Sequence, residues 1–71
     1  MKQTIRQKGH NVTKMRVNAG MNQRALSEKA GVCRAVICTL EQGKPVKVET
    51  ASKVAQALGR EINELFEIKT I

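Results

Sequence analysis

The sequence predicts an all-α domain of five short helices. Aliphatic residues recur every three or four positions in several segments, a spacing that places them on one face of a helix. Glycines at positions 20, 31, 43 and 59 separate these segments, and glycine enters the left-handed conformation that ends many helices without strain. The chain has 71 residues and one aromatic side chain, Phe66, so we expect one domain with a small, aliphatic core.

The first two helices are predicted at residues 11–19 and 22–30. Asn11 is expected to cap the first helix and Gly20 to end it. Asn22 is expected to cap the second helix, because its side-chain oxygen can accept hydrogen bonds from the free amides of the first turn. Gly31 then ends this helix and leaves a tight turn before the next one.

The third helix is predicted to begin at Cys33 or Arg34 and to end at Gly43. At about 100° per residue, its side chains divide into an inward and an outward group. The inward group is Val36, Ile37 and Leu40, and the outward group is Arg34, Ala35, Cys38, Thr39 and Gln42. The outward group has neither a bulky apolar residue nor an acid, so it can enter a DNA major groove without steric clash or charge repulsion.

Two further helices are predicted at residues 48–58 and 62–67. Their expected buried residues are Val48, Ala51, Val54, Ala55 and Leu58 in the first, and Ile62, Leu65 and Phe66 in the second. Lys47 is a poor cap for the first of them. The tail at 68–71 alternates apolar and polar residues, as a half-buried strand does, and residues 2–6 tolerate a strand. We therefore hypothesise that the two ends pair, either within one chain or between two chains.

Several spaced residues in this order resemble one known family. They are Gln23, Leu26, the Gly31-Val32 turn, Ile37, Leu40-Glu41 and Gly43-Lys44. The pattern is similar to the helix-turn-helix of Cro and C1-type phage repressors and the XRE-like regulators, from about residue 12 to residue 66. The resemblance implies a five-helix lambda-repressor-like domain at 11–67, preceded by a basic arm at 1–10 and followed by a tail at 68–71. It implies sequence-specific binding of double-stranded DNA and regulation of transcription, most simply as a repressor.

The resemblance also implies which residues hold the DNA backbone. Gln23 would anchor a phosphate at the start of the second helix, where free amides and the helix dipole favour an anion. Arg24 would add positive charge beside it. Lys44, in the loop after the third helix, would contact a second phosphate, and Lys47 either contacts phosphate or is merely solvated.

Base contacts are expected from the outward side of the third helix. Arg34 is the main candidate, because its guanidinium fork matches O6 and N7 of guanine, although it can instead hold a phosphate. Ala35 and Thr39 can contact thymine methyl groups. Ala35 can equally make no contact and only leave room for the DNA. Cys38 can pack against a methyl group. Cys33 occupies a cap position where this family usually has serine or threonine, so a contact by a hydroxyl there is in doubt.

A structural ion pair is expected between Arg16 and Glu41. Arg16 lies at the edge of the apolar face of the first helix, and Glu41 lies at the edge of the inward side of the third. Family resemblance implies that they pair and tie these helices together. Their first role is therefore structural.

The net charge of +7 is unevenly placed. Residues 1–47 hold ten basic and two acidic side chains, a charge of +8, whereas residues 48–71 have a charge of −1. One cationic side suits binding to a polyanion. The basic arm at 1–10 can lie along DNA, fray, or pair with the tail.

Functions other than DNA binding have weaker support in the sequence. There is one histidine, His10, and no nucleophile or phosphate-loop motif, so we expect neither an enzyme nor a bound cofactor. His10, Cys33 and Cys38 are poorly spaced for a metal site, and the two cysteines lie roughly 7.5 Å apart by helix rise alone, too far for a disulfide. Oxidation of Cys33 remains a minor alternative to simple packing.

The strongest alternative is a protein-interaction module of the antitoxin type, which binds a protein partner and its own promoter. Such proteins usually carry an added partner-binding segment, and this sequence has little beyond the five helices. With neither an apolar stretch that could span a membrane nor a signal peptide, a cytoplasmic protein is expected. A short recognition helix covers few base pairs, so a homodimer on palindromic half-sites is expected, with residues 62–71 as the suggested contact.

Overall fold

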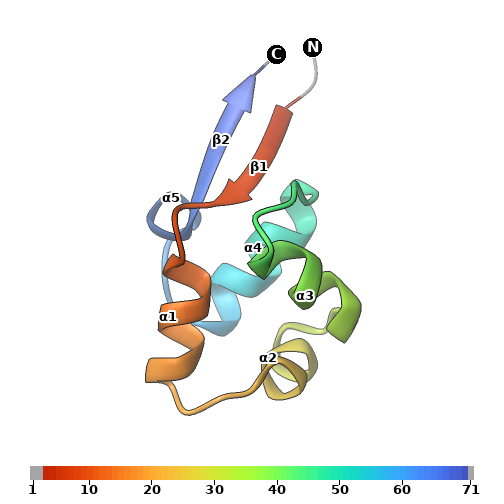
Figure 1. Ribbon diagram of the computed structural model, residues 1–71, viewed down its shortest axis with the longest axis vertical. Coiled ribbons are helices and arrows are strands. Elements are labelled where there is room, and N and C mark those ends of the chain that lie inside the picture. The colour runs from red at the N-terminus through yellow and green to blue at the C-terminus, as the bar shows by residue number, and fades with distance from the viewer. Residues whose placement is uncertain (1–2, 71) are drawn as a thin grey trace.

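Five helices and two terminal strands make up the fold. In this computed structural model, which describes residues 3–70, the order is β1 (Gln3–Gln7), α1 (Asn11–Asn18), α2 (Gln23–Ala30), α3 (Arg34–Glu41), α4 (Val48–Ala57), α5 (Ile62–Leu65) and β2 (Phe66–Thr70). The helices form a compact group, and the paired strands project from it along the longest axis of the molecule (Figure 1). The predicted fold class, five helices with short terminal strands, is confirmed.

Aliphatic side chains from nearly every element fill the core. The buried apolar residues are Ile5, Val12, Leu26, Ile37, Leu40, Ala51, Val54, Ala55, Leu65 and Phe66. Ile5 comes from β1 and Phe66 from β2, and each is only 1% exposed. The strands therefore contribute to the core and are not appended to a finished helical domain.

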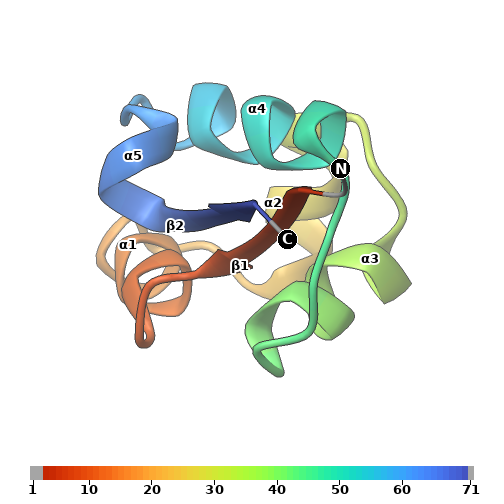
Figure 2. The same ribbon diagram turned by 90° about the horizontal axis from the view of Figure 1, so that it is seen from above.

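The two terminal strands pair antiparallel within one chain. The register joins Thr4 to Lys69, Ile5 to Ile68 and Arg6 to Glu67. The opposite edge of β1 meets the loop before α4, where the Val46 amide donates to the Ile5 carbonyl at 2.8 Å. Seen from above, β1 and β2 cross the helical group side by side (Figure 2). Of the three alternatives for the basic arm, residues 3–7 adopt the third, pairing with the tail; residues 1, 2 and 71 lie outside the described part of the chain.

Three local predictions are wrong. Asn11 does not cap α1: the cap position is His10, and the Asn11 side chain instead donates to the Glu64 carbonyl at 3.0 Å. The last helix ends at residue 65, because Phe66 is extended (φ −130°, ψ 149°) and begins the strand that pairs with β1. Val48 is 48% exposed, since it is the first residue of α4 and precedes the buried stripe.

The predicted cap of α2 is confirmed. The Asn22 side chain accepts a hydrogen bond from the Ala25 amide at 2.8 Å, and Gly31 ends the helix with a φ of 72°. We expect Asn22→Ala to lower the free energy of unfolding by about 1 kcal/mol, because the amide loses its partner. Urea unfolding followed by circular dichroism measures this, with Asn18→Ala, an exposed position at the end of α1, as control. Equal losses in the two variants would contradict a capping role.

Candidate nucleic-acid interface

Helices α2 and α3 form a helix-turn-helix. Both helices have eight residues, and the turn between them closes with a hydrogen bond from the Val32 amide to the Ser27 carbonyl at 3.0 Å. Leu26 of α2 and Ile37 and Leu40 of α3 are fully buried, so each helix is held by its inner side. The opposite side of α3 faces outward at the edge of the molecule (Figure 1).

The outward side of α3 carries the predicted base-contacting residues. Arg34 and Ala35 are exposed in the first turn, whereas Cys38 and Thr39 are half-buried one turn later. The Thr39 hydroxyl donates to the Ala35 carbonyl at 2.9 Å, which leaves its methyl group and hydroxyl lone pairs for an external contact. Most side chains on this surface are short, and Arg34 is the only charged side chain among them; the other long side chain, Gln42, donates to Cys38 Sγ at the end of the helix.

A polar hollow lies beside the first turn of α3. It has a volume of about 340 Å³ and is lined by Arg16, Asn22, Gln23, Arg24 and Arg34. The structure thus brings three predicted DNA-binding residues, Gln23, Arg24 and Arg34, to one place at the start of α2. Arg24 is highly exposed and pairs with Glu28 at 3.1 Å on its own helix. Helix amides and guanidinium groups together suit a phosphate.

The loop after α3 borders a second hollow of about 380 Å³. Its lining is Ala35, Val36, Thr39, Pro45, Val46, Lys47 and Thr50. Lys44 and Lys47 are both exposed, and Lys47 occupies the cap position of α4 without capping it, as its sequence predicts. The predicted phosphate contacts therefore form two groups: Gln23 and Arg24 lie beside the first turn of α3, and Lys44 and Lys47 lie in the loop that follows the helix.

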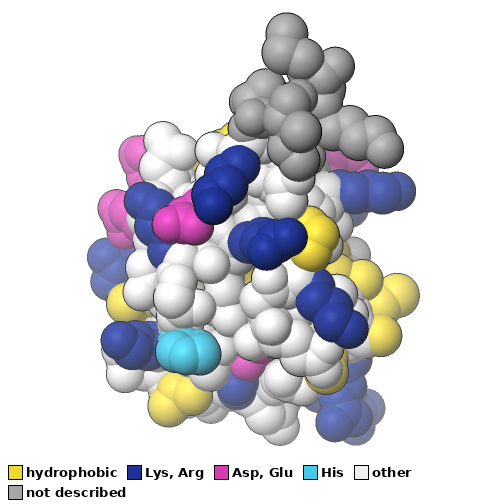
Figure 3. Space-filling view, turned by 45° about the horizontal axis from the view of Figure 1, so that its top comes forward, with side chains coloured by type: hydrophobic (Ala, Val, Ile, Leu, Met, Phe, Trp, Pro, Cys, Tyr) yellow, Lys and Arg dark blue, Asp and Glu magenta, His cyan; other side chains and the backbone are white. Residues whose placement is uncertain are grey.

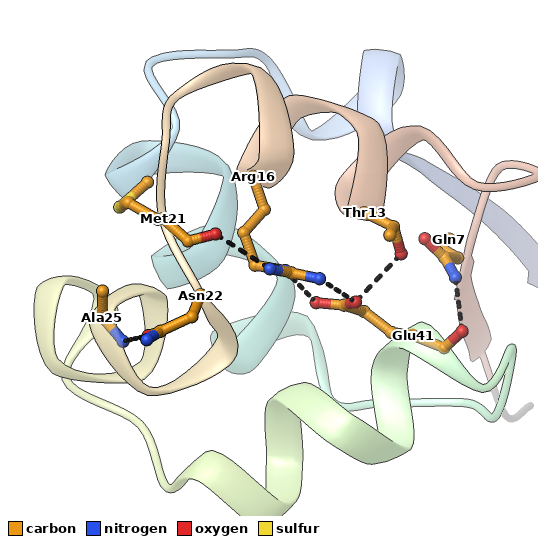
Figure 4. A network of polar contacts seen from close by, with 7 residues as sticks. All are labelled: Gln7, Thr13, Arg16, Met21, Asn22, Ala25 and Glu41. Atoms are coloured by element: carbon orange, nitrogen blue, oxygen red, sulfur yellow. Dashed lines mark hydrogen bonds and ion pairs between the residues drawn. The ribbon is translucent and has the colours of Figure 1, made fainter.

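Arg16 and Glu41 form the predicted ion pair, and it anchors the carboxyl end of α3 (Figure 4). Arg16 Nε lies 2.8 Å from Glu41 Oε2, and Nη2 lies 3.1 Å from Oε1. The side chains are only 14% and 7% exposed, so the pair is largely shielded from water. Arg16 Nη1 also donates to the Met21 carbonyl at 2.8 Å. One guanidinium group therefore joins α1, α3 and the loop that leads into α2.

Two further residues support this pair, and neither was predicted from the sequence. The Thr13 hydroxyl donates to Glu41 Oε1 at 3.1 Å. Gln7 of β1, which is 6% exposed, donates from Nε2 to the Glu41 backbone carbonyl at 3.0 Å. Alternation along β1 places Gln7 on the same side as buried Ile5, and this pattern was the available clue. The terminal strand thus holds the end of the recognition helix.

Basic side chains are widespread on the surface that includes the strands (Figure 3). Acidic side chains are fewer there, in agreement with the charge of the amino-terminal two thirds of the sequence. Cys33, at the cap position of α3, is an exposed free thiol and makes no side-chain cap, as expected for a weak acceptor. Cys38 is also a free thiol and accepts from Gln42 Nε2 at 3.5 Å. Within residues 3–70, no group of three histidine, cysteine or acidic side chains is placed to hold a metal ion.

Comparison with family models decides the family. The model described as helix-turn-helix matches residues 12–65, which extend from the second residue of α1 to the end of α5. This chain is a helix-turn-helix protein of the Cro/C1-type, XRE-like family. Its members bind DNA and regulate transcription, and this regulator has the fold that the family resemblance implied. None of the helices in the described part of this regulator is long and apolar enough to cross a membrane.

Two solved structures resemble this helix-turn-helix regulator. The restriction-modification controller protein C.AhdI from Aeromonas hydrophila has a TM-score of 0.73 and 28% identity, with 79% of this chain and 86% of that chain covered. The transcriptional regulator VanUg has a TM-score of 0.68 and 15% identity, with 100% and 92% covered. The comparison with curated proteins gave no match. The second likeness includes all of this chain, so it extends to the fold of the terminal strands.

Proposed function

We propose that this regulator binds a specific double-stranded DNA sequence by placing α3 in the major groove, and that it represses transcription from the promoters it occupies. The observation that carries the proposal is the outward side of α3, where the exposed Arg34 has short side chains as neighbours. The carboxyl end of this helix is held in place by the bonds of Glu41 to Arg16 and Gln7. A bound domain covers its DNA site and so competes with other proteins there. We propose that it acts by binding alone and without catalysis or a cofactor.

The phosphate contacts are proposed on both sides of α3. Gln23 and Arg24 would hold one strand at the polar hollow, and Lys44 would hold the backbone beyond the other end of α3. Contacts on either side of the groove fix how deeply a recognition helix enters it. Ala35, Thr39 and Cys38 would lie against bases, with Cys33 near the first of them.

We propose that the DNA-bound form is a homodimer. A helix of eight residues reaches few base pairs, and a two-fold dimer doubles the contacted sequence and places half-sites about one helical turn apart. C.AhdI, a restriction-modification controller protein that is 28% identical to this chain, supports a regulatory role. We propose the cytoplasm as its location, where exposed thiols such as Cys33 stay reduced.

Selection from random-sequence duplexes, followed by sequencing, tests this function. An enriched palindrome is the expected result, and weak binding without an enriched sequence would contradict it and favour a protein-interaction module. Gln23→Ala is expected to weaken binding to all sequences alike, because a phosphate contact carries no sequence information. Gln56→Ala, a loss of the same carboxamide at an exposed position of α4, is the control. A change in the selected sequence with Gln23→Ala would place that residue at a base instead.

A further inference from the structure

The carboxyl end of α3 has one backbone carbonyl that the local chain does not satisfy. In an α-helix the carbonyl of one residue pairs with the amide four residues later, and for Glu41 that residue is Pro45, which has no N–H group. The carbonyls of residues 38–40 accept from amides of residues 42–44. Among residues 3–70, only the Gln7 side chain donates to the Glu41 carbonyl, from Nε2 at 3.0 Å. Gln7 thus supplies the donor that the proline lacks.

The Gln7 side chain is buried for the sake of this one bond. It is only 6% exposed, and its Oε1 atom accepts no hydrogen bond from any residue in the described part of the chain. A buried acceptor without a donor lowers stability. An apolar side chain of equal length would occupy the same place without that loss. The carboxamide is therefore explained by its Nε2 donor and by the carbonyl that receives it.

Strand β1 holds the loop after α3 at a second point. The Val46 amide donates to the Ile5 carbonyl at 2.8 Å, and Ile5 is only 1% exposed. Figure 4 shows the first point, where Gln7 reaches from β1 to Glu41 at the end of α3. β1 therefore bonds to this loop at both of its ends. The segment between the two bonds includes Lys44, whose side chain is exposed.

We propose that Gln7 is a positioning residue for DNA binding: it fixes the loop after α3 so that Lys44 meets a phosphate while α3 lies in the major groove. The inference rests on the proposed function, in which Lys44 holds the DNA backbone. Gln7 is buried and acts only through the Glu41 carbonyl. Because both ends of the loop are bonded to β1, the loop is already ordered in the free protein, and less lost freedom opposes binding. Without the Gln7 bond one end is released, and the contact of Lys44 weakens.

Gln7→Met tests this positioning without DNA. The variant keeps the length of the side chain and removes both polar atoms, so the unpaired Oε1 disappears while the Glu41 carbonyl loses its donor. One unpaired acceptor replaces another, and the thermal midpoint should stay within about 5 °C of the parent value. In amide hydrogen exchange, the Gly43 and Lys44 amides should exchange about tenfold faster, whereas the Val46 amide should keep its protection, since its acceptor is a backbone carbonyl of β1. Unchanged exchange at the first two amides would overturn the proposal.

Binding to the selected duplex over a range of salt concentrations tests the effect on Lys44. Gln7→Met should weaken binding about three- to tenfold and should lower the slope of log K against log salt by ~0.9 for each bound domain, the value for one phosphate contact. Lys44→Ala should have the same effects, and Gln7→Met should add little to them in a double variant, because both changes act on one contact. Gln56→Met, the same chemical change at an exposed position of α4, should alter neither affinity nor slope.

The two experiments fail in different ways. Full affinity of Gln7→Met, or an equal further loss when it is added to Lys44→Ala, would overturn the positioning role even if the parent protein binds its palindrome as proposed. A parent protein that binds no duplex would contradict the proposed function and with it the role of Lys44. Faster exchange in Gln7→Met would in that case still support the fixing of the loop by Gln7, because that measurement includes no DNA.

Discussion

Glu41→Ala is expected to destabilise this regulator by about 3–5 kcal/mol, because it leaves Arg16 charged and shielded from water without its partner. The Arg16 side chain is 14% exposed, and two of its nitrogens bond to Glu41. Thr13 would lose its acceptor as well. Small domains are stable by about 5–15 kcal/mol in all, so the variant should be partly unfolded at 37 °C.

Urea unfolding measures this loss, and the chain offers a matched control. Glu28→Ala removes a carboxylate from an exposed pair with Arg24, in which the two side chains are 77% and 68% exposed, and should change stability by less than about 1 kcal/mol. The double variant Arg16→Met/Glu41→Leu should recover most of the stability, since an apolar pair of similar size leaves no buried charge. A Glu41→Ala loss no larger than that of Glu28→Ala would show that the pair contributes little.

Local patterns in the sequence were sufficient for most of the helical frame. Asn22 and Gly31 act within their own helix, so their chemistry alone predicted where α2 begins and ends. Leu26, Ile37 and Leu40 are buried as predicted, because apolar residues at helical spacing share one face of a helix and that face packs against the core. The ion pair of Arg16 and Glu41 came from family resemblance, and the structure forms it.

Contacts between distant segments were harder to predict. Ile5 is in the core and Gln7 holds the end of α3, but both functions depend on β2, more than fifty residues away. Before that pairing is known, a basic segment of ten residues can equally be an arm that lies along DNA, a frayed end, or a strand. Phe66 was assigned to a helix for the same reason: its extended conformation is fixed by the register with β1 and not by its neighbours in sequence.

The role of Arg34 also depends on spatial arrangement, and one variant separates its two possibilities. Arg34 lines the same hollow as Gln23 and Arg24. Its guanidinium group can therefore bind either a phosphate or the edge of a guanine base. Arg34→Lys keeps the positive charge but removes the bidentate fork that matches O6 and N7 of guanine. We expect Arg34→Lys to remove about 1–3 kcal/mol of discrimination at one guanine position in each half-site, and a dimer bound to a palindrome doubles that effect.

The measurement is competition between the selected palindrome and a version with the guanine replaced in both half-sites. The parent protein should prefer the selected sequence by one to several factors of ten, since about 1.4 kcal/mol corresponds to tenfold. Arg34→Lys should bind the two duplexes nearly equally, with the salt dependence of the parent, because the number of positive charges is unchanged. Arg24→Ala, which removes a positive charge beside the same hollow, should weaken both duplexes and keep the preference. If Arg34→Lys instead keeps the full preference, Arg34 holds a phosphate and the specificity of α3 must come from Thr39 and its small neighbours.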